Sequence, residues 1–125
     1  MYSGGLESNI KKYQIISRAT EPFPGISLSV VEEELPRATA SQAADEMINA
    51  AGIRAAFVVY GERGGAVVSA RSYGKVNVQV IMEKIGGGGS INAAGGQFPD
   101  KHPDDAAAML RQAIEAYLRE SPEQG

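Results

Sequence analysis

The hydrophobic and polar positions of the chain repeat with two periods, which predicts a mixture of helices and strands. Apolar residues three and four positions apart indicate helices, and apolar residues at every second position or in short runs indicate strands. The sequence therefore predicts helices over residues 6–19, 39–51, 77–85 and 103–118, and strands over 26–31, 54–60, 66–72 and, after a bend, within 91–98. This order predicts an α/β fold, a single domain with a mixed β-sheet of about four to five strands flanked by helices.

The clearest predicted helix begins at Thr39. Thr39 and Gln42 match a capping pattern in which both side chains satisfy backbone N–H groups that are open at a helix start. Gly52 follows the helix at a place where a left-handed C-terminal cap is favourable. The apolar positions between them form one stripe along the helix: Ala40, Ala43, Ala44, Met47, Ile48 and Ala51.

The alternating strand at 26–31 is predicted to turn one face toward the core. The acidic run Glu32–Glu34 after it is interpreted as a solvated strand end rather than as an acidic functional site. The next two strands, joined by the glycine-bearing segment 61–65, are predicted to form a β-hairpin. The helix that precedes all of them, at 6–19, is predicted from residues at near-helical spacing: Leu6, Ile10, Tyr13 and Ser17.

Residues 77–85 fit two patterns. Val76, Val78 and Val80 alternate as in a strand, whereas Val78, Ile81, Met82 and Ile85 would share a helix face. Asn77 is a favourable N-cap, and four consecutive glycines from Gly86 would end a helix. We therefore predict a helix here.

Composition narrows the classes of function. The 125 residues carry a formal net charge of −3 with a pI near 5.2, which argues against a general nucleic-acid binder with a basic surface. There is no cysteine and there is one histidine, so a disulfide framework and a zinc site are not expected. No apolar run approaches the roughly 20 residues of a membrane span, and no signal peptide is visible.

The glycine run from Gly86 to Gly89, ended by Ser90, is the most unusual feature of the sequence. It matches a flexible linker letter for letter, but the residues after it offer too little to fold alone, so it is expected to lie inside one domain. There it could cradle a phosphate with backbone N–H groups or form a structural turn, and the residues favour neither. No Lys-Ser/Thr pair follows it, so it is not a Walker loop.

The other polar candidates have simpler interpretations. Arg71, at the end of a predicted strand, is either a surface residue or a bidentate phosphate ligand. The acidic and histidine residues at 100–105 are interpreted as a loop that leads into a capped helix rather than as a metal cluster: Asp100, His102, Asp104 and Asp105. No serine has a histidine partner in a recognisable motif, so nucleophilic catalysis is not indicated.

A combined pattern is formed by three segments: 55–60, the stretch 69–89 with its Ser-Ala-Arg-Ser and Asn-Val-Gln motifs, and 92–95. Together these segments resemble the DHH-associated (DHHA) C-terminal domain of the DHH phosphoesterases, most of all the GdpP-type cyclic-di-AMP phosphodiesterases. Segments 35–37 and 41–45 are also similar to that family, so that the resemblance covers roughly residues 10–118. It implies one nucleotide-binding domain over 1–125, excised from a longer DHH phosphodiesterase, with 1–6 and 121–125 flexible.

The resemblance implies that this domain holds a nucleotide or cyclic dinucleotide while a separate DHH domain of the same parent chain, with two manganese ions, hydrolyses it. The substrate would be cyclic-di-AMP or short oligoribonucleotides, and the chain alone would hydrolyse nothing and hold no metal. It further implies a cytoplasmic location, with no membrane contact by this domain, although the parent could be anchored to the membrane or form a homodimer. The nucleotide-binding residues would be Arg71, Ser72, Asn77, Gly86, Gly87, Gly88, Gly89, Ser90, Asn92, Ala93, Ala94 and Gly95.

One position departs from the family pattern. The family's glycine run normally ends in histidine, and here Ser90 stands in that place. Serine is shorter and carries no charge near neutral pH, so affinity, turnover or substrate would differ. Two other functions stay open: a non-catalytic RNA-contacting module, disfavoured by the acidic balance, and a structural or dimerising domain.

Overall fold

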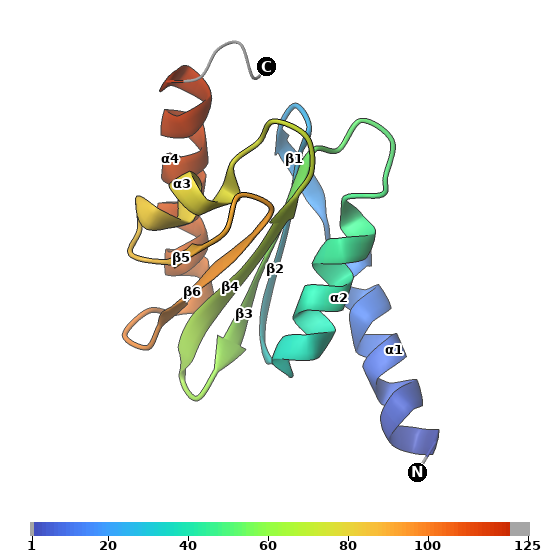
Figure 1. Cartoon of the computed structure of the whole chain (residues 1–125). Coiled ribbons are helices and arrows are strands. Elements are labelled where there is room, and N and C mark those ends of the chain that lie inside the picture. Colours follow the sequence, from blue (N-terminus) through green and yellow to red (C-terminus); the bar gives the residue numbers. More distant parts are fainter. Residues whose placement is uncertain (1, 121–125) are drawn as a thin grey trace.

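The computed structural model describes residues 2–120. Six strands form one mixed sheet in the order β1-β2-β3-β4-β6-β5, in which β2 and β3 are parallel and every other neighbouring pair is antiparallel (Figure 1). The predicted mixed α/β sheet is confirmed, with six strands where four to five were expected. The strands are β1 (Thr20–Phe23), β2 (Ile26–Glu34), β3 (Ala55–Glu62), β4 (Gly65–Ser72), β5 (Gly88–Gly89) and β6 (Ala93–Phe98).

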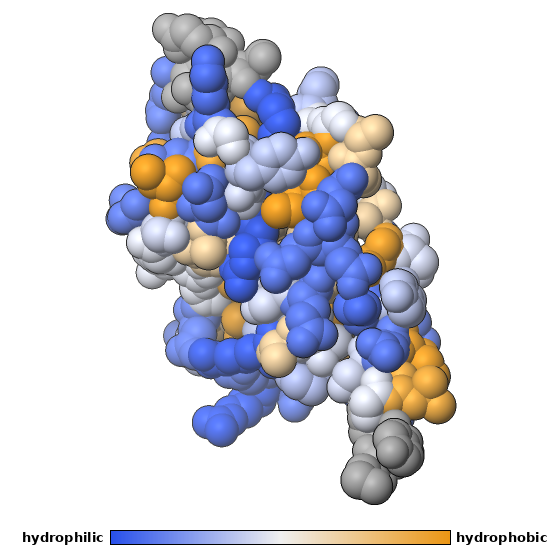
Figure 2. Space-filling model, turned by 45° about the vertical axis from the view of Figure 1, so that its right-hand side comes forward, coloured by the Kyte–Doolittle hydropathy of each residue, from blue (hydrophilic) through white to orange (hydrophobic). Residues whose placement is uncertain are grey.

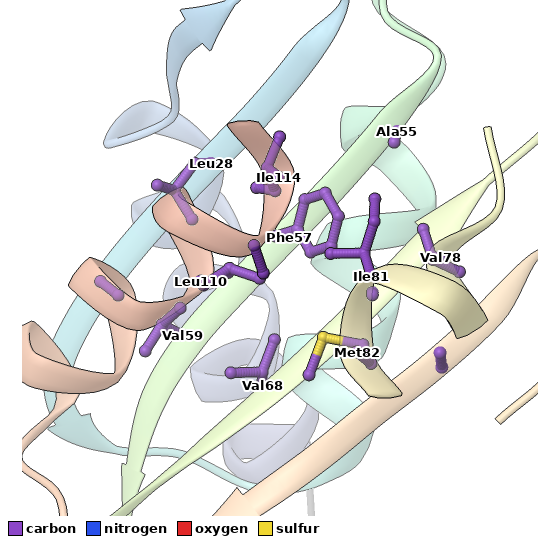
Figure 3. Packing of buried hydrophobic residues seen from close by; sticks show 14 of the residues in the cluster. Leu28, Ala55, Phe57, Val59, Val68, Val78, Ile81, Met82, Leu110 and Ile114 are labelled. Carbon is purple, nitrogen blue, oxygen red and sulfur yellow. The ribbon is translucent and has the colours of Figure 1, made fainter. Parts of the chain in front are cut away.

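Helices cover both faces of this sheet (Figure 1). On one face, α3 (Val78–Glu83) and the long α4 (Pro103–Glu120) pack over the larger apolar cluster, where Ile81, Met82, Leu110 and Ile114 meet Phe57 of β3 (Figure 3). On the other face, α1 (Tyr2–Ser17) and α2 (Arg37–Met47) pack over a second cluster. Among the described residues, no helix is long and apolar enough to cross a membrane.

Strand β2 is buried on both faces, which the alternating sequence did not indicate. Its polar residues Ser27 and Ser29 were expected on a solvent face, yet they are 6% and 0% exposed. Ser29 lies under α1, where its hydroxyl donates a 2.7 Å hydrogen bond to the carbonyl oxygen of Ile15. Because the hydroxyl group of Ser29 has this hydrogen-bond partner, burying the side chain costs little free energy. The acidic end of the strand, Glu32–Glu34, is exposed as predicted.

Helix α1 has an apolar outer side. Leu6, Ile10 and Tyr13, whose spacing predicted this helix, are 62%, 49% and 58% exposed. Ile15 anchors the helix to the sheet instead and is 1% exposed. An apolar patch is visible in Figure 2 beside the grey N-terminal end. The helix begins at Tyr2, while residues 121–125, expected to be flexible, lie outside the described residues, so flexible ends stay a prediction.

Both predicted ends of α2 were wrong. Of the predicted stripe, Ala40, Ala43, Ala44 and Met47 are buried in the helix, whereas Ile48 and Ala51 lie beyond it and Ala51 is exposed. The helix starts at Arg37, and Pro36 precedes it without a side-chain cap. Thr39, the predicted cap, lies inside the first turn and is 3% exposed. Pro36 fixes an extended backbone at this point and thereby sets the start of the helix. The helix ends at Met47, so Gly52, with φ of +81°, serves a turn several residues farther on.

The hairpin between β3 and β4 is tighter than predicted. Glu62 pairs with Gly65, which leaves a two-residue turn in place of the five-residue segment 61–65. Arg63 and Gly64 have φ of +53° and +82°, the positive values of a type I′ turn, which matches the twist of paired strands. Gly61 lies within β3, where a Cβ would be 2.7 Å from the Glu32 carbonyl oxygen, so the position has no room for a side chain.

The ambiguous segment after β4 is a helix, as predicted. The Asn77 side chain accepts a 3.1 Å hydrogen bond from the Val80 backbone N–H and so caps α3. Gly86, with φ of +95°, lies just beyond the helix and turns the chain toward β5. The glycine run thus connects α3 to the edge of the sheet and is not an interdomain linker.

Candidate nucleotide-binding cleft

A cleft of about 520 Å³ opens on the sheet face that carries α2. Its volume falls within the range of about 300–1,000 Å³ that is typical of small-molecule sites. One wall is the N-terminal part of α2, and the floor and the other wall come from β4, β6 and the edge strand β5. The lining residues are Arg37, Ser41, Tyr60, Val67, Val68, Ser69, Arg71, Gly88, Gly89, Ala93, Ala94, Gly95, Gly96 and Gln97.

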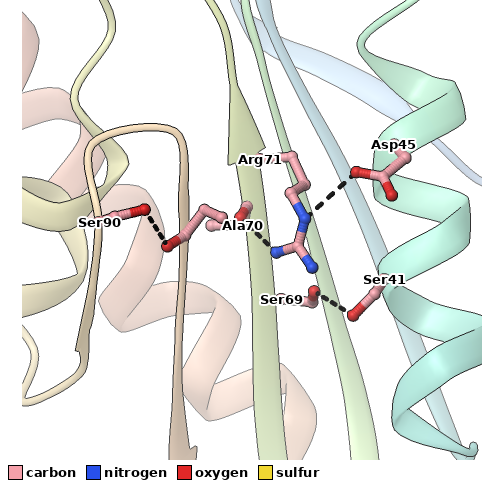
Figure 4. A network of polar contacts seen from close by, with 7 residues as sticks. Ser41, Asp45, Ser69, Ala70, Arg71 and Ser90 are labelled. Atoms are coloured by element: carbon pink, nitrogen blue, oxygen red, sulfur yellow. Dashed lines mark hydrogen bonds and ion pairs between the residues drawn. The ribbon is translucent and has the colours of Figure 1, made fainter.

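Arg71 reaches from β4 across the cleft toward α2 (Figure 4). Its Nε lies 3.2 Å from Asp45 Oδ1, and its Nη1 donates a 2.8 Å hydrogen bond to the Ala70 carbonyl oxygen. The side chain is 24% exposed, and among residues 2–120 no partner is recorded for Nη2. Two protein contacts therefore orient the guanidinium group and leave one of its nitrogen atoms able to donate to an anion.

The α2 wall was not predicted from the sequence. Arg37, Ser41 and Asp45 are four residues apart, so they share one side of the helix. The Ser41 and Ser69 hydroxyl oxygens are 3.3 Å apart, which ties α2 to β4 beside Arg71 (Figure 4). Two signals were available in the sequence. One was the similarity of segments 35–37 and 41–45 to the DHHA domain, and the other was the repeat of polar residues next to the buried alanine stripe, which also fits an ordinary solvent-facing side.

At the other end of the cleft, Arg37 forms a two-pronged ion pair with Glu62. Nε and Nη2 donate 2.9 Å hydrogen bonds to Oε1 and Oε2. The hydrogen bond from Arg37 lowers the pKa of Glu62, and the same contact raises the pKa of Arg37. With the Gln97 amide oriented so that its oxygen faces Arg37, this oxygen accepts hydrogen bonds from Nη1, at 3.1 Å, and from Nη2. Burial raises the pKa of Tyr60.

Glycine forms the wall opposite α2 because two strands approach there without room for side chains. Gly88 pairs with Gly95, and Gly89 pairs with Ala94. A Cβ on Gly95 would lie 2.5 Å from the Val68 carbonyl oxygen, and one on Gly89 would lie 2.5 Å from the Ala93 carbonyl oxygen. Gly89 also has φ of +144°, a conformation that side chains rarely permit. Gly88 has open space around it, so close packing does not explain every glycine of the run.

Six of the twelve predicted site residues line the cleft: Arg71, Gly88, Gly89, Ala93, Ala94 and Gly95. Ser72 is 5% exposed, and its hydroxyl donates to the Val76 and Ile91 carbonyl oxygens and accepts from the Asn92 amide. It therefore joins two loops at the end of the cleft. A direct contact between Ser72 or Asn92 and a nucleotide stays a prediction.

The other four predicted residues lie outside the lining. Asn77 caps α3, and Gly86 and Gly87 follow that helix, with the Gly87 N–H bonded to the Met82 carbonyl oxygen at 2.8 Å. Ser90 is exposed in the β5–β6 turn, where its N–H and hydroxyl both donate to the Ala93 carbonyl oxygen, at 2.8 and 3.1 Å. The serine side chain thus closes its own turn, and a ligand contact by any of the four stays a prediction.

One group of potential metal ligands occurs among the described residues. Glu32, His102 and Asp104 have ligand atoms within 4.8 Å of one another, and all three are exposed. His102 Nδ1 accepts a 3.2 Å hydrogen bond from the Asp104 N–H at the start of α4, as expected of a loop that leads into a capped helix. None of the three lines the cleft, so the cleft itself does not offer the carboxylate and histidine ligands of a two-metal centre.

Comparison with known proteins places the chain in a family. The family model for the DHHA1 domain matches residues 24–120, and the chain belongs to that family. Over 112 residues it is 38% identical to the cyclic-di-AMP phosphodiesterase GdpP of Geobacillus thermodenitrificans, covering 87% of this chain and 17% of the relative. It is 44% identical over 89 residues to the cyclic-di-AMP phosphodiesterase PdeA of Listeria monocytogenes, covering 70% of this chain and 14% of the relative.

The fold is also shared with solved structures. An exopolyphosphatase-related protein from Bacteroides fragilis superposes with a TM-score of 0.75 at 18% identity, over 89% of this chain and 35% of that one. The family model and the two relatives confirm the family resemblance seen in the sequence. The chain spans less than a fifth of the length of the two phosphodiesterases that it matches.

Proposed function

We propose that this chain is the substrate-binding domain of a DHH-family phosphodiesterase that acts on cyclic-di-AMP or short oligoribonucleotides. Its cleft holds a nucleotide phosphate while a separate DHH domain carries out hydrolysis. The similarity to two cyclic-di-AMP phosphodiesterases over most of the chain supports the substrate class. The observation that carries the proposal is the Arg71 guanidinium group, oriented in the same cleft as the glycine wall, with one nitrogen atom available.

The chemistry of the cleft suits binding rather than bond cleavage. Arginine donates in a planar fork that matches a phosphate, and glycine lets a ligand approach the backbone closely. Because the net charge of the chain is −3, a phosphate would be attracted by this local site and not by a generally basic surface. Two manganese ions, if present in the parent protein, would supply an activated water and charge stabilisation from ligands in the DHH domain.

Replacement of Arg71 by methionine tests this function. Methionine retains most of the aliphatic length and removes the donors, so we expect the Kd for AMP or pApA to rise roughly 10- to 150-fold, the equivalent of one charged hydrogen-bonded contact. Binding is followed by calorimetry and by amide chemical shifts of Gly88, Gly89 and Gly95. Arg111→Met is the matched control, because Arg111 is exposed on α4, which covers the other face of the sheet.

The two variants change the net charge equally, so a difference between them reports on the cleft. The proposal fails if the unaltered chain shows no shifts at the three glycines with millimolar cyclic-di-AMP, pApA or AMP. It also fails if Arg71→Met and Arg111→Met bind these ligands alike. Tighter, salt-dependent binding to single-stranded RNA than to dinucleotides would favour the RNA-contacting module instead.

A further inference from the structure

The cleft has two arginines at opposite ends. On β6, Ala93 pairs with Arg71, and Gln97 is the neighbour of Arg37. Ala93 and Gln97 are four residues apart, which is about 13 Å along the strand. Along α2, Arg37 and Asp45 are eight residues apart, or about 12 Å. Because Glu62 holds one guanidinium group and Asp45 holds the other, the two do not converge on one phosphate group.

The two guanidinium groups also differ in what they can still donate. Arg71 uses one nitrogen on Asp45 and one on its neighbouring carbonyl oxygen, and Nη2 has no recorded partner within residues 2–120. Arg37 has all three of its nitrogen atoms engaged, by Glu62 and by Gln97, and its charge is compensated by the carboxylate. Its side chain is nevertheless 57% exposed. Arg37 therefore presents a fixed, planar guanidinium group to the cleft and is less suited than Arg71 to bind a phosphate.

A nucleobase needs such a surface, and the aromatic side chain of the lining does not supply one. Bases bind proteins by stacking on aromatic rings or on arginine guanidinium planes. Tyr60 is the aromatic residue of the lining, and it is 1% exposed. Beside Arg37, Gln97 is exposed; Arg37 engages its amide oxygen, and its NH2 group can donate to the hydrogen-bonding edge of a base.

We propose that Arg37 and Gln97 form a nucleobase subsite at the end of the cleft opposite to Arg71. The ion pair with Glu62 fixes the plane of the Arg37 guanidinium group. This inference rests on the proposed function, since it assigns the base of the same nucleotide whose phosphate Arg71 holds. Phosphate affinity would then come from Arg71 and the glycine wall. The preference for a nucleotide over a plain sugar phosphate would come from Arg37.

Lysine at position 37 separates stacking from charge, because it keeps the positive charge and removes the planar group. Calorimetry compares AMP with ribose 5-phosphate, which has the same phosphate and no base. We expect the unaltered chain to bind AMP roughly 5- to 150-fold more tightly than ribose 5-phosphate, the value of one stacked base. Arg37→Lys should bring the Kd of AMP close to that of ribose 5-phosphate and leave the latter within about twofold. Arg111→Lys is the matched control.

The outcomes distinguish this subsite from the proposed function. If neither ligand binds the unaltered chain, the phosphate site and the base subsite are both wrong. If both ligands bind and Arg37→Lys preserves their ratio, the base subsite alone is wrong. If Arg37→Lys weakens both ligands equally, Arg37 contacts the phosphate and the assignment to a base is overturned.

Discussion

The glycine wall allows a sharp test of whether close packing or ligand contact requires each glycine. Gly88 and Gly95 face each other in the β5–β6 pairing and both line the cleft. A methyl group on Gly95 would lie 2.5 Å from the Val68 carbonyl oxygen, whereas one on Gly88 would have nothing within 4 Å. The same substitution to alanine at two directly paired positions is therefore expected to destabilise the protein at Gly95 and to have little effect at Gly88.

The geometry sets the size of the effect. Ordinary contacts of a Cβ begin at 3.4 Å, so Gly95→Ala must separate β6 from β4 by about 0.9 Å where Ser69 pairs with Gly95. Forced insertion of a methyl group into packed structure costs roughly 1–3 kcal/mol. For a domain of this size each kcal/mol lowers the Tm by about 3–6 °C, so we expect a fall of roughly 6–12 °C for a cost of about 2 kcal/mol. Gly88→Ala should change stability by less than about 0.5 kcal/mol.

Urea and thermal unfolding of both variants measure these effects, and AMP titration of the folded variants shows whether either substitution alters binding. The steric argument is refuted if Gly95→Ala and Gly88→Ala unfold at the same urea concentration. A stable Gly88→Ala variant with weakened AMP binding would show that this glycine is needed for the ligand rather than for the fold.

Two other contacts give measurable expectations. Asn77→Ala removes the side-chain acceptor for the Val80 N–H and should destabilise the protein by about 1 kcal/mol in urea unfolding, whereas an unchanged midpoint would show that the cap contributes nothing. Arg37 lowers the folded-state pKa of Glu62 below its ordinary 4.5, so the pair stabilises the protein above that pH, and this stability is lost as the pH falls through the lower folded-state value. The Tm difference between the unaltered chain and Glu62→Gln should therefore be present at pH 7 and shrink in acid, and a difference independent of pH would contradict the pairing.

The apolar outer side of α1 illustrates what periodicity can and cannot show. Leu6, Ile10 and Tyr13 predicted a helix correctly, yet none of them belongs to the core. Ile15 faces the sheet because α1 crosses β2 at the point where Ser29 bonds to it. A helical repeat therefore shows that residues share a side, and only packing decides what that side meets.

The sequence determined those elements that depend on interactions between residues close together in the chain. The alanine stripe of α2 and the Asn77 cap of α3 depend on neighbours within one or two turns, and both are confirmed. The type I′ turn at Arg63–Gly64 is equally local, but three glycines within the five residues 61–65 left its position undetermined. The glycine run was unusual enough to be noticed, although its residues alone did not distinguish a phosphate cradle from a turn.

Tertiary structure decided which residues form the cleft. Asp45 lies 26 positions before Arg71, and Gln97 lies 60 positions after Arg37, so no spacing in the sequence connects these pairs. They meet because the crossover helix α2 lies against β4, and because β6 returns to pair with β4 in a fixed register. The sequence alone identified Arg71 and the glycines as the unusual residues of this protein. The packing of α2 against the sheet gave Arg71 its orientation and placed a second arginine at the far end of the same cleft.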